Sequence, residues 1–180
     1  MKILVIAAHP DLNNSRANKA LLQGLNKNND AIHIRKLYEL YPDWNVDTEK
    51  EQALLLQYDR IVLQFPFYWY SCPPLLKKWF DDVMKPGWAY GPGGNRLVGK
   101  EFLIATTTGG SDKSYRSGGD NQFTISELLR PMERTVTKCK GTYLPAFVCY
   151  NANALTHEGL EREANRYAEH IRTLMPVLAH

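Results

Sequence analysis

The most distinctive side chains of this chain lie in residues 63–70, which read L-Q-F-P-F-Y-W-Y. The aliphatic run 59–64 has the length of a strand buried on both faces, and Pro66 cannot donate to a strand ladder, so we expect pairing to stop there. The aromatic residues then follow the carboxyl end of a strand, where open parallel sheets bind ligands. We expect this segment to hold a flat ring; the alternative is an aromatic cluster that caps the core.

A second loop gathers polar groups directly after the first aliphatic run, residues 1–8. From His9 to Asn18 it reads H-P-D-L-N-N-S-R-A-N, ahead of a predicted helix whose free N–H groups favour an anion. One interpretation is a phosphate pocket; the other is that Ser15 caps the helix and His9 satisfies a turn. The sequence contains neither G-x-G-x-x-G nor G-x-x-x-x-G-K-[ST], so the dinucleotide fingerprint and the P-loop are both absent.

Two further loops are rich in glycine. Residues 106–111 read T-T-T-G-G-S, and adjacent glycines let backbone N–H groups approach a ligand closely, for example at a ring carbonyl. The competing interpretation is a flexible turn, although residues 115–119 extend the segment to the size of a ligand-binding loop. Residues 85–99 hold Trp88 and Tyr90, and we expect this surface to become ordered against a ligand or another subunit.

Short aliphatic runs alternate with helical patterns along the whole chain. The predicted strands are residues 1–8, 31–36, 60–64, 100–106 and 142–150, and the predicted helices are 16–26, 48–57, 73–84, 124–138 and 156–173. Such alternation, without a Pro/Ser-rich linker, predicts an α/β fold: a doubly wound, five-stranded parallel sheet with helices on both faces. We expect residues 1–180 to form one domain.

Composition narrows the class of function. The net charge of +3 is spread without a run of basic residues, so nucleic acid is a poor partner. The three cysteines show no metal-ligand spacing and no disulfide framework, which predicts reduced thiols, no metal site and a cytoplasmic protein. The opening apolar run is too short for a secretory signal or a membrane span.

Four motifs occur in a characteristic order: H-P-x(4)-S-R-A-N, then Q-F-P-x-Y-W-Y-S-C-P-P-L-L-K-x-W-x-D, then G-W-A-Y-G, then T-T-G-G. With these motifs the chain resembles the flavodoxin-like NAD(P)H:quinone reductases. It is most similar to the short bacterial members, which include the ancillary subunits of glutathione-gated potassium-efflux systems. The resemblance runs from the first strand to the last helix.

The resemblance implies a flavin whose phosphate lies in the first loop. It assigns the phosphate to His9, Ser15, Arg16 and Asn18, one side of the ring to Pro66, Phe67, Tyr68, Trp69 and Tyr70, and the opposite edge to Thr107, Thr108, Gly109 and Gly110. Tyr115 would hydrogen-bond the pyrimidine side and is the expected catalytic residue, because donors at that edge stabilise the reduced ring. FMN is favoured over FAD, since the phosphate loop is compact and the chain is short.

The implied activity is two-electron hydride transfer from NAD(P)H to quinones or related electrophiles, by a ping-pong mechanism in which both substrates use one site. The resemblance also implies a homodimer, to which residues 38–44 and the loop with Trp88 and Tyr90 are expected to contribute. Family members carry a histidine after the tyrosine, whereas this chain reads Y-R-S-G-G-D-N from Tyr115. Arg116, Asp120 or Asn121 is expected to substitute, or solvent exchanges the proton.

Another class of function is a regulatory ancillary subunit that docks on a potassium-efflux membrane protein from the inner face of the cell membrane. The flavin pocket would be the same in that case. An electron-transfer flavodoxin fits poorly, since those proteins are strongly acidic. A hydrolase is unsupported, because the chain has no G-x-S-x-G elbow.

Overall fold

A computed structural model describes residues 1–25 and 31–174. Its strands are β1 (Ile3–Ala7), β2 (Ile32–Lys36), β3 (Arg60–Pro66), β4 (Glu101–Thr107), β5 (Thr142–Tyr143) and β6 (Phe147–Cys149). They form one parallel sheet in the order β2-β1-β3-β4-β5, and β6 pairs with β4 beyond β5. The chain moves outward from β1 to β2 and then returns to β3, so the strand order reverses between β1 and β3.

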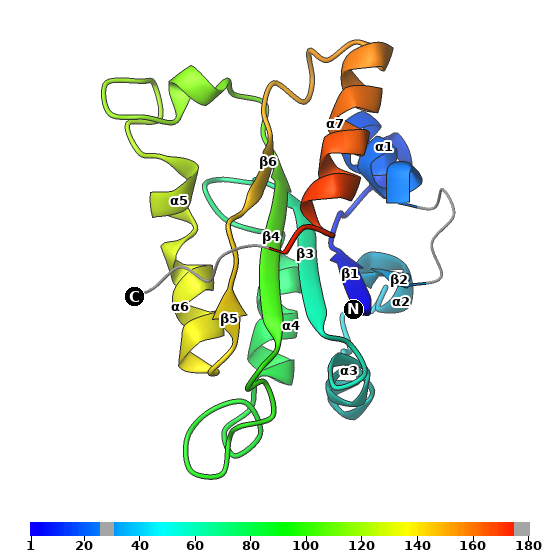
Figure 1. Cartoon of the computed structure of the whole chain (residues 1–180), viewed down its shortest axis with the longest axis vertical. Coiled ribbons are helices and arrows are strands. Elements are labelled where there is room, and N and C mark those ends of the chain that lie inside the picture. Colours follow the sequence, from blue (N-terminus) through cyan, green and yellow to red (C-terminus); the bar gives the residue numbers. More distant parts are fainter. Residues whose placement is uncertain (26–30, 175–180) are drawn as a thin grey trace.

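Helices cover both faces of this sheet (Figure 1). They are α1 (Arg16–Leu25), α2 (Leu37–Leu40), α3 (Thr48–Leu55), α4 (Pro74–Val83), α5 (Ile125–Leu128), α6 (Arg130–Lys138) and α7 (His157–His170), with short 3-10 turns at η1 (Leu12–Asn14) and η2 (Asp112–Ser114). One core lies between the sheet and the pair α1 and α7; the other lies under α2 to α6. The predicted layer architecture and parallel sheet are therefore confirmed.

Strand β3 shows why both faces need cover. Ile61 and Leu63 point into one core, whereas Val62 points into the other, since side chains alternate along a strand. On the face of the sheet that Val62 enters, α1 and α7 pack closely against each other. A Cβ added at Gly24 of α1 would lie 2.9 Å from the Cβ of Ala164 of α7. These contacts hold the start of α1 at the carboxyl edge of the sheet.

Two predicted elements are broken by proline. The helix predicted over 124–138 is two helices, α5 and α6, because Pro131 lacks an N–H and fits only the first turn of a helix. The strand predicted over 142–150 splits into β5 and β6 on either side of Pro145. The short helix α2 was not predicted, and Asn26, the expected end of the first helix, lies outside the described residues.

Pairing does not stop at Pro66 as the sequence predicted. Pro66 pairs with Thr107 of β4, and the N–H of Phe67 donates to the Thr107 carbonyl at 2.8 Å. Because backbone groups alternate along a strand, the Pro66 nitrogen faces the opposite side, where the pairing of β1 with β3 has already ended at Ala7. The missing N–H of Pro66 therefore costs no hydrogen bond of the sheet. Pro66 borders the crevice between β1 and β3.

Candidate functional site

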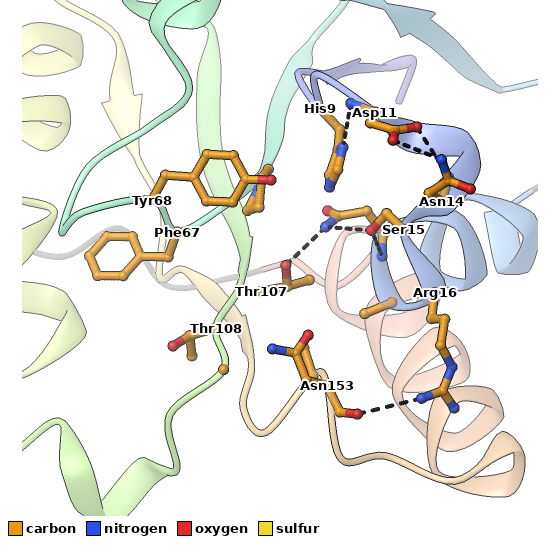
Figure 2. A pocket seen from close by; sticks show the side chains of 15 residues that line it. His9, Asp11, Asn14, Ser15, Arg16, Phe67, Tyr68, Thr107, Thr108 and Asn153 are labelled. Carbon is orange, nitrogen blue, oxygen red and sulfur yellow. Dashed lines mark hydrogen bonds between the residues drawn. The ribbon is translucent and has the colours of Figure 1, made fainter.

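A cavity of about 440 Å³ opens at this crevice, outside the carboxyl ends of β1, β3, β4 and β6 (Figure 2). It is lined by His9, Asp11, Asn14, Ser15, Arg16, Ala17, Asn18, Pro66, Phe67, Tyr68, Thr107, Thr108, Gly109, Ala152 and Asn153. Its location is the one that the reversal of strand order predicts for a ligand.

The floor of the polar end is held by a buried amide. The Asn18 side chain is 3% exposed, and its Nδ2 donates to Thr107 Oγ1 at 2.9 Å. The side-chain Nε2 of Gln64 donates to the Asn18 carbonyl at 3.1 Å and to Asn18 Oδ1 at 3.3 Å. These bonds tie the first turn of α1 to β3 and β4, so Asn18 fixes the shape of the polar end.

The start of α1 combines a cap with open donors. Ser15 Oγ accepts the N–H of Asn18 at 3.3 Å, as an N-cap does. The backbone N–H groups of Arg16 and Ala17 have no acceptor in the part of the chain that the structure describes. The Ser15 hydroxyl still has a proton to donate. Capping and anion binding are therefore compatible at this helix end, and the cavity lies directly in front of it.

Arg16 and His9 flank the polar end (Figure 2). The Arg16 guanidinium donates to the Leu155 carbonyl at 2.8 Å and to the Asn153 carbonyl at 3.4 Å, which fixes its charge beside the cavity. His9 Nδ1 accepts the N–H of Asp11 at 3.0 Å, which leaves Nε2–H as the donor. Burial lowers the pKa of His9, against the opposing charge of Asp11, so the neutral ring is favoured.

The other end of the cavity is aromatic. Pro66, Phe67 and Tyr68 line it, but the next two residues, Trp69 and Tyr70, do not belong to its lining. Tyr68 and Ser71 exchange backbone hydrogen bonds of 3.1 and 2.9 Å, and Trp69 and Tyr70 between them have φ angles of 47° and 61°. This is the pattern of a type I′ turn, which normally takes Asn and Gly, so two bulky residues make it strained. Trp69 is 92% exposed.

The loop after β4 forms the third wall. Thr107, Thr108 and Gly109 line the cavity, and Thr108 Oγ1 lies 2.8 Å from Tyr115 Oη. Gly110 does not line the cavity but lies against the Tyr115 ring, where an added Cβ would be 3.0 Å from Cε2. The glycine is therefore needed for the close approach of Tyr115.

The structure brings together ten of the fourteen predicted site residues. Those that line the cavity are His9, Ser15, Arg16, Asn18, Pro66, Phe67, Tyr68, Thr107, Thr108 and Gly109; those outside its lining are Trp69, Tyr70, Gly110 and Tyr115. The sequence analysis missed Asp11, Asn14, Ala17, Ala152 and Asn153. Three of these stand inside the polar loop, and the other two follow the last strand, so the carboxyl-end rule applied to every strand would have found them.

The cavity has the chemistry for an elongated ligand with two unlike ends. Hydroxyl, guanidinium and backbone N–H donors suit an anion, and Phe67 and Tyr68 suit a flat ring. Among the described residues no group of His, Cys, Asp or Glu has the arrangement of a metal site. Within residues 1–25 and 31–174, every helix is too short or too polar to span a lipid bilayer.

Relatives of known sequence match nearly the whole chain. The uncharacterised NAD(P)H oxidoreductase YdeQ of Bacillus subtilis is 47% identical over 174 residues, which are 97% of this chain and 88% of that protein. The glutathione-regulated potassium-efflux system ancillary protein KefG of Salmonella paratyphi B is 43% identical over 169 residues, which are 93% of this chain and 91% of that protein.

Solved structures match as well. A structure described as a thermophilic tryptophan halogenase from Streptomycin violaceusniger has a TM-score of 0.92 and 46% identity, covering 96% of this chain and 99% of that one. General stress protein 14 of Treponema denticola, in complex with FMN, has a TM-score of 0.88 and 36% identity, covering 93% and 95%. The NADPH-quinone reductase of P. pentosaceus has a TM-score of 0.87 and 36% identity, covering 97% and 99%.

The family described as Flavodoxin-like fold matches residues 1–171. This match includes all of the cavity lining, the strand order and the four motifs that the sequence analysis singled out. The chain therefore belongs to the flavodoxin-like fold family.

Proposed function

We propose that this protein is a flavin-dependent NAD(P)H:quinone oxidoreductase that holds FMN in the cavity between β1 and β3. The observation that carries the proposal is that one cavity has both an end with anion-binding donors at α1 and an aromatic end at Phe67 and Tyr68. FMN has the same two ends, a phosphate and a flat ring. The NAD(P)H oxidoreductase YdeQ, the FMN-bound stress protein and the NADPH-quinone reductase support this function.

The residues of the polar end would hold the phosphate. Ser15 Oγ and the N–H groups of Arg16 and Ala17 are donors, and the fixed guanidinium of Arg16 adds a positive charge. His9 offers Nε2–H while it stays neutral. Asn18 contributes indirectly, because its buried bonds hold this turn in place.

The aromatic end would orient the flat substrates. FMN supplies the centre that accepts a hydride and passes it on. Phe67 and Tyr68 would hold the flavin ring, and a nicotinamide or a quinone would stack in turn on the face of the flavin that stays exposed, since stacking on a flat surface does not discriminate strongly between them. When both substrates use one binding site in turn, the kinetics are ping-pong. Double-reciprocal plots of initial rate against NADPH concentration, each at a fixed quinone concentration, should therefore be parallel. Intersecting lines would contradict the shared site.

The first test is the visible spectrum of the purified protein. We expect a yellow protein that bleaches on anaerobic addition of NADPH and regains its colour with a quinone, and the mass of the extracted cofactor names FMN or FAD. A variant with Ser15→Ala should retain less flavin, whereas Ser126→Ala, remote from this cavity, should retain as much as the wild type. A protein that stays colourless when FMN and FAD are supplied would contradict the proposal.

The halogenase named among the solved structures calls for a control. No observation at this cavity favours halogenation over hydride transfer. Tryptophan and a halide are therefore added to reduced protein in air, and we expect no halogenated product. If halogenated tryptophan forms as fast as quinone is reduced, the proposed function is contradicted in favour of halogenation.

The proposed assembly is a homodimer in the cytoplasm. A groove of about 590 Å³ lies between α4 and α6, lined in part by Phe80, Met84, Tyr90 and Met132. Tyr90 belongs to the loop that the sequence analysis assigned to a subunit contact. A second copy of the chain is the proposed occupant, and Met132→Glu should shift the mass measured by light scattering from dimer to monomer. A wild-type monomer at micromolar concentration would contradict the assembly.

A second candidate function is that of an ancillary subunit of a potassium-efflux membrane protein. KefG supports it by name, and the 92% exposed indole of Trp69 offers an apolar contact on the surface. Co-purification with a tagged efflux protein tests it, with Trp69→Ser as the matched variant. If the wild type does not co-purify with the tagged efflux protein, this second function is contradicted and the reductase function remains.

A further inference from the structure

A buried carboxylate, that of Glu51 in α3, joins four separate elements on one face of the sheet. Its Oε1 accepts hydrogen bonds from Nε of Arg35 in β2 and from Oη of Tyr41 at the end of α2, both at 2.7 Å, and Arg35 Nη2 also donates to it. Its Oε2 accepts Nε1–H of Trp79 in α4 at 3.0 Å. Because each partner belongs to a different element, Glu51 sets the positions of β2, α2 and α4 around α3.

The burial of this network calls for an explanation. Glu51 and Trp79 are fully buried, and Arg35 is 9% exposed. Burying an ion pair removes the hydration of both charges, so an apolar pair of similar size is often at least as stable. Directional hydrogen bonds, however, favour a single arrangement of the groups that they join. The network therefore accounts for a fixed position of α4 better than for stability, and α4 begins shortly after the aromatic end of the cavity.

The start of α4 is capped from α2. Its N-cap residue, Pro73, has no side chain that accepts a hydrogen bond, and Pro74 follows. The N–H of Leu75 donates to Tyr38 Oη at 3.3 Å, and it has no other acceptor in residues 1–25 and 31–174. A free N–H at a helix start needs such a partner when it is buried. The phenol of Tyr38 therefore takes the place of the missing cap.

The same phenol lies beside the aromatic end of the cavity. Burial raises the pKa of Tyr38, and the nearby Cys72 and Tyr68 add to this rise. Tyr68 lines the cavity, whereas Tyr38 does not, so Tyr38 supports the lining from outside. Tyr41 lies one helical turn from the start of α2, and its N–H donates to the Leu37 carbonyl at 3.0 Å. The bond from Tyr41 to Glu51 therefore holds the turn that carries Tyr38.

We propose that Glu51 is a positioning residue for the aromatic end of the cavity, and that it acts through Tyr41 and the Tyr38 cap on α4. The ligand in this proposal is the flavin of the proposed function, on which it rests in that respect. Glu51 itself touches no ligand. Its role is to keep α2 and α4 in one relative position, so that Tyr68 stays in place beside the flat ring.

The test measures the cap and the ligand separately in the full chain. Exchange of the Leu75 amide proton is followed by NMR in the ligand-free protein, and affinities for FMN and riboflavin are measured by fluorescence titration. Tyr38→Phe removes the cap, so exchange at Leu75 should be about tenfold faster, as for loss of one hydrogen bond. Both flavins should bind about threefold more weakly, since both carry the ring that this end of the cavity holds.

Two variants test the link back to the carboxylate. Glu51→Gln removes the charge, and Tyr41→Phe breaks only the hydrogen bonds of that hydroxyl. Both should accelerate exchange at Leu75 and weaken both flavins by a common factor. Tyr41→Phe decides the question if Glu51→Gln does not fold. Wild-type exchange and wild-type flavin affinity in Tyr41→Phe, or in a folded Glu51→Gln, would overturn the proposal.

A double variant decides whether the route runs through the cap. Tyr38→Phe/Tyr41→Phe should bind both flavins as Tyr38→Phe does, because the two changes act on the same cap. If the two losses add, Tyr41 affects the flavin by another route and the proposal is wrong.

Two controls separate position from stability. Ile171→Ala leaves a space in the core on the opposite face, so it should lower the unfolding temperature but leave exchange at Leu75 and both flavin affinities as in the wild type. Lys36→Met/Glu39→Met removes an exposed ion pair next to the network and should change none of these quantities. If Ile171→Ala weakens flavin binding as much as Glu51→Gln does, Glu51 acts through stability alone and the proposal is wrong.

The exchange measurement also separates this inference from the proposed function. It needs no ligand, so it tests the link from Glu51 to the cap even if the wild type binds no flavin, a result that would contradict the function. A wild type that binds flavin, with exchange at Leu75 unchanged in every variant of the network, would overturn the inference and leave the function standing.

Discussion

The two ends of the cavity are built in opposite ways. At the polar end, Asn18, Thr107 and Gln64 form buried hydrogen bonds that leave the start of α1 in one position. Beside the aromatic end, Trp69 and Tyr70 occupy a strained turn, in which Trp69 is 92% exposed and Tyr70 about half exposed. The comparison indicates that buried hydrogen bonds preorganise the polar end, whereas the turn beside the aromatic end has no such buried network.

The physical reason lies in what each end must bury. A buried amide or hydroxyl without a partner costs about 1–3 kcal/mol, so the hydrogen bonds among Asn18, Thr107 and Gln64 stabilise this floor, although the buried Gln64 Oε1 has no partner among the described residues. Aromatic faces carry no such requirement and gain when a flat molecule covers them. A strained turn persists only where the surrounding structure holds it in place, and the hydrogen-bonded polar floor is part of that structure.

Breaking the polar floor should have the largest effect. Asn18→Leu removes the partner of Thr107 and one acceptor of Gln64 in a buried site, and we expect it to lower the free energy of unfolding by about 3 kcal/mol. Asn14→Leu is the matched control, because Asn14 is exposed and, among the described residues, its side chain bonds only to Asp11 in its own loop. Urea unfolding measures both. Equal losses for the two variants would mean that the floor is not preorganised.

A second experiment separates the ends by ligand. Arg16→Ala should weaken FMN binding about tenfold, as for loss of a charge-assisted contact, but should leave the binding of riboflavin unchanged, since riboflavin lacks the phosphate. Phe67→Leu should weaken both ligands by a similar factor, because both carry the ring. Fluorescence titration with the two flavins gives the four dissociation constants. Loss of riboflavin binding in Arg16→Ala would contradict the assignment of the ends.

A third experiment removes the backbone strain at Trp69 and asks whether stability changes while FMN binding does not. Trp69→Asn places a residue that adopts positive φ readily and should raise the free energy of unfolding by about 1 kcal/mol, with FMN affinity within about twofold of the wild type. Trp69→Val should lower stability, because a β-branched residue adopts this conformation poorly. Both are measured by urea unfolding. A loss of stability in Trp69→Asn would show that the exposed indole stabilises the ligand-free fold.

The smallest expected effect concerns pH. Burial lowers the pKa of His9 below its ordinary value of 6.5, so the unfolded chain binds more protons there, and stability falls as pH drops from 6.5 through the lowered folded pKa. Ligand-free His9→Gln should lose less stability than the wild type between pH 7 and about pH 5. His157→Gln is the control, since His157 is exposed. Thermal unfolding at each pH measures the difference, and an unchanged loss in His9→Gln would contradict it.

Most of the fold followed from local pattern, and apart from the missed helix α2 the main errors lay at prolines. Alternating aliphatic and helical segments predict a parallel sheet because each pattern buries its own face. Pro131 and Pro145 divided elements that the pattern had predicted as continuous, and Pro66 was tolerated in a strand because its nitrogen faces the end of β1. That residues 1–180 form one flavin-binding domain stays a prediction.

The sequence predicted the loops that form the candidate site more accurately than the individual residues that line it. Residues next to strand ends were found because topology gathers all such ends at one edge. Tyr70 and Trp69 were assigned to the ring because of their type; in the structure they form a turn outside the cavity lining, and φ angles of this kind are not visible in a sequence of aromatic residues. The roles of Tyr115, and of whichever residue follows it in place of histidine, stay predictions.

The sequence by itself determined the class of sheet, the family motifs and the loops that carry polar and aromatic groups, since these depend on residue type and on spacing within one segment. Only the tertiary structure decided which residues meet across segments. It joined Asn18 to Thr107, fixed Arg16 to the loop after β6, and placed the Thr108 hydroxyl between Tyr115 and the cavity. Such contacts depend on how separate strands and helices pack, and hydrogen-bond geometry is sensitive to shifts of less than an ångström.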